Sequence, residues 1–225
     1  MINLTFLEED LANKERQINE VLDLIDILDR NNVFLSEENN LVYPSKRLIN
    51  TLKGSTYLML YNAVESTLRE CINHIHDILE TKNENFDNLR VEIKKEIFRR
   101  IKSGHREIKD IISESAKPIS KTLHHTTLNK RKLFSGNIDA EEVKKLAIIY
   151  GFSISTDARK TKNGATLSDI KEKRNALAHG NIDFDQVARI ESIRDIRDVA
   201  STTINYLSAL LENIDDYITS NGFIQ

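Results

Sequence analysis

The stretch EKRNALAHGN, residues 172–181, places an arginine, an asparagine and a histidine within six positions of a sequence that otherwise reads as helix. Wound at 3.6 residues per turn, four apolar residues of this helix fall within roughly 100° of one another: Leu167, Ile170, Leu177 and Ala178. Arg174 lies inside this apolar stripe and not opposite it. Because an unpaired buried charge costs several kcal/mol, an arginine at this position needs a partner.

The composition around this stretch is that of a helical protein. Among 225 residues there are only 7 glycines and 2 prolines, while Leu, Ile, Glu and Lys are frequent. Few helix breakers and many good helix formers favour an all-α protein with one sizeable core. The single cysteine, Cys71, excludes an intrachain disulfide and lies on an apolar helical face, which predicts a core thiol.

Apolar residues recur three or four positions apart along most of the chain, so we expect one domain over residues 1–225, built as a helical bundle. Its parts are an N-terminal helix and loop (1–45), a long helix (46–81), a basic helical insertion (86–132), a helix over 140–150, the short motif helix, and a long C-terminal helix over 185–220 that includes Val187 and Ile190. No strand is expected.

Capping residues predict where several of these helices begin and end. Asp139, with Glu142 three residues later, indicates the start of the helix over 140–150. The polar segment 153–166 predicts a loop, and Thr166 or Ser168 is expected to cap the motif helix that follows. Gly180 stands where a left-handed residue ends a helix.

Charge is distributed unevenly, although the net charge is only −3. Residues 90–132 carry 13 lysines and arginines against 5 acidic residues, and the flanking segments are acidic. Such a block predicts either a surface for a polyanion or a surface that docks on the acidic N-terminal part of this chain or of a partner. The candidate RNA-binding residues are Arg99, Arg100, Arg106, Lys130, Arg131 and Lys132.

The motif helix carries the side chains that could do chemistry. Asn175 and His179 are four residues apart and share one face, while the long side chain of Arg174 can reach toward the helix end. A guanidinium, an imidazole and an orienting amide suffice to attack a phosphodiester without a metal ion. The alternative is a surface arginine and histidine at a helix end, with no catalytic role.

No metal site or cofactor site is expected elsewhere in the sequence. His74 and His76 are two residues apart, so a helix turns them away from each other, and no ligand lies at a suitable spacing from His124 and His125. Glycine-rich phosphate loops, nucleophile elbows and zinc patterns are absent from the sequence.

The stretch KEKRNALAHGN resembles the signature of the HEPN superfamily, an arginine and a histidine separated by four to six residues just before a last long helix. The segments LMLYNAVESTLRE and LFSGNIDAEEVKKLAIIYGF are similar to the first core helix and to the segment before the motif in stand-alone HEPN families of defence and toxin loci, including the RiboL-PSP type. The resemblance covers roughly residues 45–220 and implies a HEPN-like helical bundle.

The resemblance also implies a metal-independent endoribonuclease that acts as a homodimer, with two motif helices facing one cleft. Arg174 would stabilise the scissile phosphate, His179 would be the general acid and base, and Asn175 would orient the histidine or the RNA. The RNA 2′-hydroxyl would attack, leaving a 2′,3′-cyclic phosphate. Glu65 is the candidate partner of Arg174; the alternative is an ordinary surface pair of Glu65 with Arg69.

Three functions follow from these features. The first is a ribonuclease, acting as a toxin or abortive-infection effector and controlled by an antitoxin or another defence-system protein. The second is a non-catalytic HEPN module that binds a nucleotide, RNA or a partner protein, and the third is a helical adaptor that docks through its basic block. No apolar run is long enough to cross a membrane, so we expect a cytoplasmic protein without membrane partners.

Overall fold

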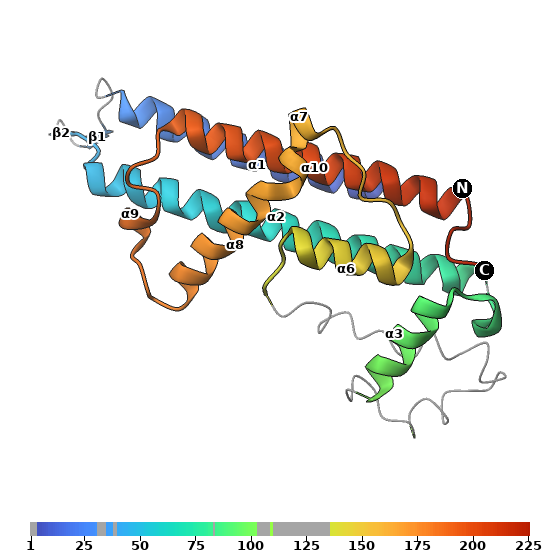
Figure 1. Ribbon diagram of the computed structural model, residues 1–225. Coiled ribbons are helices and arrows are strands. Elements are labelled where there is room, and N and C mark those ends of the chain that lie inside the picture. The colour runs from blue at the N-terminus through green and yellow to red at the C-terminus, as the bar shows by residue number, and fades with distance from the viewer. Residues whose placement is uncertain (1–3, 31–34, 38–39, 83, 103–108, 110–135) are drawn as a thin grey trace. The chain divides into compact units, whose positions relative to one another are not determined.

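The computed structural model describes residues 4–30, 35–37, 40–82, 84–102, 109 and 136–225. Helices dominate these residues, which confirms the all-α class (Figure 1). In chain order the elements are α1 (Thr5–Asp29), β1 (Leu35–Glu37), β2 (Asn40–Val42), α2 (Lys46–Thr81), η1 (Phe86–Asn88), α3 (Val91–Lys102), α6 (Ala140–Tyr150), α7 (Ala158–Thr161), η3 (Lys162–Gly164), α8 (Ala165–Ala178), α9 (Phe184–Val187) and α10 (Ile193–Thr219).

The chain divides into two compact units, which are described separately. The motif unit consists of Glu8–Val64 and Asp157–Ser208. The terminal unit consists of Met1–Leu7, Glu65–Thr156 and Ala209–Gln225. Helices α1, α2 and α10 each contribute residues to both units.

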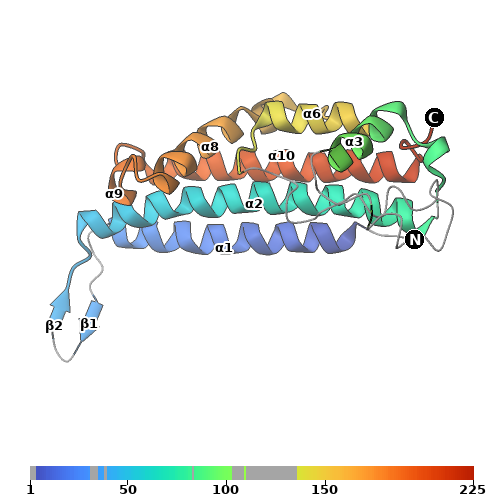
Figure 2. The same ribbon diagram turned by 90° about the horizontal axis from the view of Figure 1, so that it is seen from below.

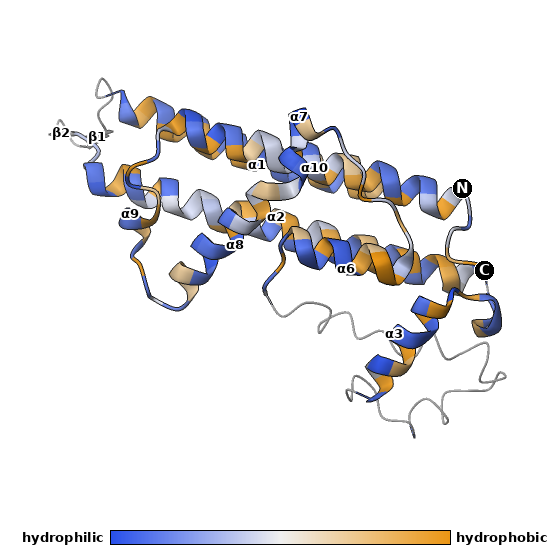
Figure 3. Ribbon diagram, in the orientation of Figure 1, coloured by the Kyte–Doolittle hydropathy of each residue, from blue (hydrophilic) through white to orange (hydrophobic). Residues whose placement is uncertain are grey.

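The motif unit has an apolar core between α1 and the first parts of α2 and α10. Ile25, Leu28 and Ile49 form one buried cluster, against which Ile193 packs. Fully burying a side chain of this size contributes about 1.5–3 kcal/mol, so such clusters hold the helices together. In Figure 3 the orange, hydrophobic segments of these helices alternate with blue ones, as expected for helices with one buried face.

Gly54 allows α9 to lie close against α2 in the motif unit. A Cβ atom at this glycine would stand 2.2 Å from the backbone oxygen of Phe184 and 2.9 Å from a methyl group of Val187. Only a hydrogen atom fits in that space. The absence of a side chain at Gly54 therefore sets the distance between the two helices.

The terminal unit is built around Tyr150 at the end of α6, which is fully buried. Nε2 of His76 lies 2.9 Å from the Tyr150 hydroxyl, and the Tyr217 hydroxyl donates a 2.6 Å hydrogen bond to the Tyr150 carbonyl. The predicted cap of α6 is confirmed, because the Asp139 side chain accepts a hydrogen bond from the Glu142 backbone N–H at 3.0 Å. Cys71 is buried, as predicted.

The predicted C-terminal helix over 185–220 is wrong at its start. The chain forms α9 and then leaves the helix, Ile190 is 97% exposed, and α10 begins only at Ile193. Ser192 and Asp195 explain the break: the Asp195 carboxylate accepts from the Ser192 backbone N–H at 2.9 Å, and Oγ of Ser192 accepts from the Asp195 N–H at 3.2 Å. This reciprocal capping begins a new helix even though the apolar spacing continues across the break.

Two further expectations need correction. The segments 35–37 and 40–42 pair as two antiparallel strands, with Leu35 opposite Val42, although no strand was expected (Figure 2). The polar segment 153–166 is not simply a loop, because it contains α7, η3 and the first residues of α8. Among the described helices, none is both long and apolar enough to cross a membrane.

Candidate active site at the end of the motif helix

Helix α8 buries one face within the motif unit. Leu167, Ile170 and Leu177 are buried there, and the Thr166 hydroxyl lies 2.9 Å from the Thr203 hydroxyl on α10. Thr166 is therefore part of the packed face and does not cap the helix as predicted. The N-cap of α8 is Gly164, which has no side chain to offer and a left-handed conformation.

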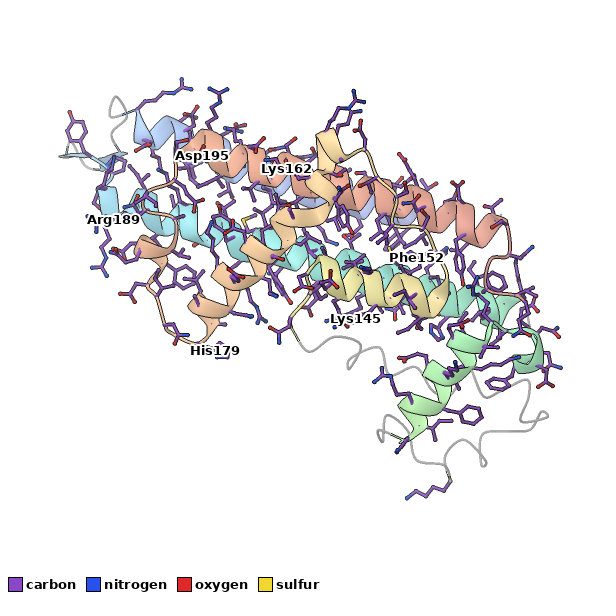
Figure 4. All side chains as sticks on the ribbon, viewed as in Figure 1. Lys145, Phe152, Lys162, His179, Arg189 and Asp195 are labelled. Carbon is purple, nitrogen blue, oxygen red and sulfur yellow. The ribbon has the colours of Figure 1, made fainter. Side chains whose placement is uncertain are left out.

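Backbone hydrogen bonds close the end of α8. The Gly180 N–H donates to the Leu177 carbonyl at 3.1 Å, and the Asn181 N–H donates to the Ala176 carbonyl at 2.9 Å. Gly180 has a φ of 67°, in the left-handed region where glycine is favoured, which confirms the predicted helix end. His179 is the C-cap residue, and its side chain lies on the surface (Figure 4).

The guanidinium of Arg174 lies against an aromatic ring. Its Cζ atom is 4.7 Å from the ring centroid of Tyr61 on α2, within the range of a cation–π contact. Its Nη1 atom also donates a 2.9 Å hydrogen bond to the Asn175 side-chain oxygen. The charge on the apolar stripe thus gains a ring face and an amide, both within the motif unit.

Lys173 makes a second contact of the same kind. Its Nζ atom lies 4.0 Å from the ring centroid of Tyr57, 2.6 Å from a carboxylate oxygen of Glu191 and 2.8 Å from one of Asp169. The Tyr57 hydroxyl donates to the other Glu191 oxygen. Burial raises the pKa of Tyr57 well above its usual value, and the hydrogen bond to Glu191 raises it further.

The comparison with family models decides the family. The model described as MAE_28990-like HEPN matches residues 4–223, almost the whole chain. The chain belongs to the HEPN superfamily. Neither the curated proteins nor the solved structures yield a significant match to this HEPN chain.

In this HEPN chain, Arg174 and Asn175 lie in the last turns of α8 and His179 is its C-cap residue. Arg174 and Asn175 are joined by their side chains, and His179 lies one turn beyond Asn175, at the exposed end of the helix. Figure 3 shows a blue, hydrophilic stretch along α8. The predicted positions at the helix end are therefore found, and their catalytic roles stay predictions.

Glu65 forms an ion pair with Arg69 in the terminal unit. This is the ordinary pair, one helical turn apart, that the sequence allowed as an alternative. A role of Glu65 beside Arg174 stays a prediction.

Only part of the predicted RNA-binding block can be placed. Arg99 lies on α3 and donates two hydrogen bonds, of 2.6 and 2.7 Å, to the buried carboxylate of Glu96, which raise the pKa of Arg99. Arg100 is also in α3, but its side chain is outside the described part. Arg106 and the three basic residues at 130–132 lie outside the described residues altogether.

Sequence reasoning missed the aromatic supports of the site, Tyr57 and Tyr61. The two tyrosines are four residues apart, so they share one face of α2, and this spacing is visible in the sequence. What the sequence does not contain is the pairing of that face with Lys173 and Arg174. In the described part of the chain, no group of three or more His, Cys, Asp or Glu residues is arranged to hold a metal ion.

Proposed function

We propose that this HEPN protein is a metal-independent endoribonuclease whose active site contains Arg174, Asn175 and His179. The observation that carries the proposal is the arrangement at the end of α8. A guanidinium is held by a ring and an amide, and an imidazole stands exposed about one turn further on. A fixed cation and an accessible proton carrier are the two groups that phosphodiester cleavage by RNA's own hydroxyl requires.

In the proposed reaction, the RNA 2′-oxygen attacks the adjacent phosphorus and the bond from phosphorus to the 5′-oxygen breaks. The imidazole of His179 accepts the proton from the 2′-hydroxyl, and the imidazolium so formed gives that proton to the leaving 5′-oxygen. The products are a 2′,3′-cyclic phosphate and a free 5′-hydroxyl, so atoms and charge balance. Arg174 stabilises the negative charge that gathers on the phosphate oxygens.

Asn175 takes a more specific role in this proposal than the sequence suggested. Its side-chain oxygen accepts a hydrogen bond from Arg174, so we assign it to orienting the arginine. The HEPN resemblance further supports a role as a toxin or antiphage-defence effector, with an antitoxin or other defence-system protein as its partner.

The direct test is to incubate the purified protein with an RNA oligonucleotide and with DNA of the same sequence, each with and without EDTA. We expect RNA cleavage that survives EDTA and leaves 2′,3′-cyclic phosphate ends, and no cleavage of DNA, which lacks the 2′-hydroxyl. Cleavage that EDTA abolishes would contradict the proposed chemistry. RNA binding without cleavage would favour a non-catalytic HEPN module.

We also propose that two copies of α8 face one cleft. Arg174 on the apolar stripe and the exposed Ala178 motivate this arrangement. Sedimentation at micromolar concentration should show a dimer, and Ala178→Glu should convert it to monomer and lower cleavage, because two like charges would meet at the two-fold axis. Ala158→Glu, at an exposed alanine of α7, is the matched control and should remain dimeric. A wild-type monomer would contradict the shared cleft.

A further inference from the structure

We infer that Tyr61 is a positioning residue of the proposed active site, whose ring holds the Arg174 guanidinium in the orientation in which it meets a phosphate. This inference rests on the proposed function, because it assigns Arg174 to the phosphate. It adds a residue from α2, outside the motif, to the site.

The Tyr61 ring and the Asn175 amide both contact the arginine side chain. The Tyr61 ring lies 4.7 Å from Cζ and supports the guanidinium, while the Asn175 oxygen, 2.9 Å from Nη1, fixes one edge. Tyr61 is 1% exposed, so its ring cannot move away without disturbing the core. A flexible side chain held at two points has lost its freedom before any ligand arrives.

An aromatic support suits a cation that must bind an anion. A guanidinium carries five N–H donors, all in its own plane. A ring that contacts the cation through its π system attracts the charge without occupying one of these donors. A carboxylate in the place of the ring would use donors and neutralise the charge. Tyr61 therefore orients Arg174 without itself using one of the guanidinium donors.

The neighbouring contact fixes the register of α8 on α2. Lys173 rests on Tyr57 and Arg174 rests on Tyr61, so consecutive residues of α8 meet tyrosines one turn apart on α2. Glu191 links Lys173 and Tyr57, because its carboxylate accepts a hydrogen bond from the Tyr57 hydroxyl and lies 2.6 Å from Nζ of Lys173. Helix α8 cannot rotate or slide without breaking both contacts. This register places Arg174 over the Tyr61 ring.

The experiment compares Tyr61→Leu, which removes the ring, with Tyr61→Phe, which keeps it. Loss of a partly buried cation–π contact predicts a roughly 3- to 30-fold lower kcat for Tyr61→Leu, with a smaller change in KM. Tyr61→Phe should restore most of the lost activity. Tyr61→Met is a second ringless variant in case the leucine variant does not fold. Leu60→Ala is the control for lost core packing, and its folded fraction should keep its kcat.

A second measurement monitors the Arg174 side chain by NMR and does not depend on RNA cleavage. The Nε–H signal of Arg174, assigned in ¹H–¹⁵N spectra by its loss in Arg174→Lys, should carry a ring-current shift. That shift should disappear in Tyr61→Leu or Tyr61→Met and persist in Tyr61→Phe. If the wild type does not cleave RNA but the shift behaves in this way, the proposed function fails while the contact stands.

Three outcomes would overturn the inference. A ringless variant that cleaves RNA with the wild-type kcat would show that the ring does not position Arg174. Equal losses in Tyr61→Phe and Tyr61→Leu would assign the effect to the hydroxyl and not to the ring. An Arg174 signal that is unchanged by removal of the ring would show that the two groups are not in contact in solution.

Discussion

Arg174→Ala and His179→Ala are each expected to slow RNA cleavage by about 100-fold or more while the protein stays folded. A general acid and base is typically worth about 10²- to 10⁴-fold in rate, and a group that stabilises developing phosphate charge is worth a comparable factor. Cleavage rates under single-turnover conditions measure the effect. Circular dichroism checks the fold, which should survive because His179 is exposed and Arg174 is only partly buried.

Two further variants bracket this result. Arg159→Ala removes an arginine that is 91% exposed on α7, and it should cleave RNA at the wild-type rate. Asn175→Ala should be slower than wild type but faster than either large-effect variant, because it removes an orienting contact and no proton carrier. Wild-type cleavage by His179→Ala would refute the catalytic assignment and favour a binding module.

The free energy of unfolding is expected to fall steeply above pH 10. The pKa values of Tyr57, Tyr206 and Tyr217 are all raised in the folded protein, chiefly by burial. An unfolded tyrosine loses its proton near pH 10, so above this pH the folded state holds protons that the unfolded state has released. Each such tyrosine lowers stability by about 1.4 kcal/mol per pH unit, and three together by up to about 4 kcal/mol per pH unit.

Urea unfolding between pH 8 and pH 12 measures this slope, and a variant assigns part of it. Tyr57→Phe should be less stable at pH 8, because it loses the hydrogen bond to Glu191. Above pH 10 its slope should be flatter than that of the wild type by about 1.4 kcal/mol per pH unit. Tyr43→Phe, at a ring that is 63% exposed, is the matched control and should keep the wild-type slope. An unchanged slope in Tyr57→Phe would contradict the raised pKa.

Much of the fold could be predicted because its signals are local. The periodicity of α2 predicted a helix over 46–81, and the structure has the same bounds. Some helix ends depend only on residues within one turn: Asp139 caps the start of α6 through the Glu142 N–H, and Gly180 ends α8 after the motif. The local sequence is therefore enough to predict where these helices begin or end.

The errors arise where two local signals compete or where none exists. Val187 and Ile190 continue the apolar spacing of α10 toward its N-terminus. The helix nevertheless begins only after them, because Ser192 and Asp195 cap a new helix start. Thr166 has a typical capping side chain, yet a hydrogen bond to Thr203, distant in sequence, makes it part of the core. Hydrogen bonds between segments far apart in the chain cannot be predicted from the spacing of residues in the sequence.

The same distinction applies to the site. The motif residues share one short helix, so the positions of Arg174, Asn175 and His179 could be predicted from the sequence. The contact between Arg174 and Tyr61 could not be predicted, because it depends on which face of α2 meets α8. The sequence showed that this arginine needs a partner without identifying the ring that provides one.

The paired contacts between α8 and α2 also restrict how the length of this chain can change during evolution. One residue inserted between Ala165 and Lys173 would turn every later side chain of α8 by about 100° and shift it by about 1.5 Å along the axis. Arg174 would leave Tyr61, Lys173 would leave Tyr57, and the proposed catalytic residues Arg174 and His179 would face a new direction. HEPN relatives that use this aromatic support should therefore carry their insertions and deletions outside α8, in segments where a change of length leaves the register intact.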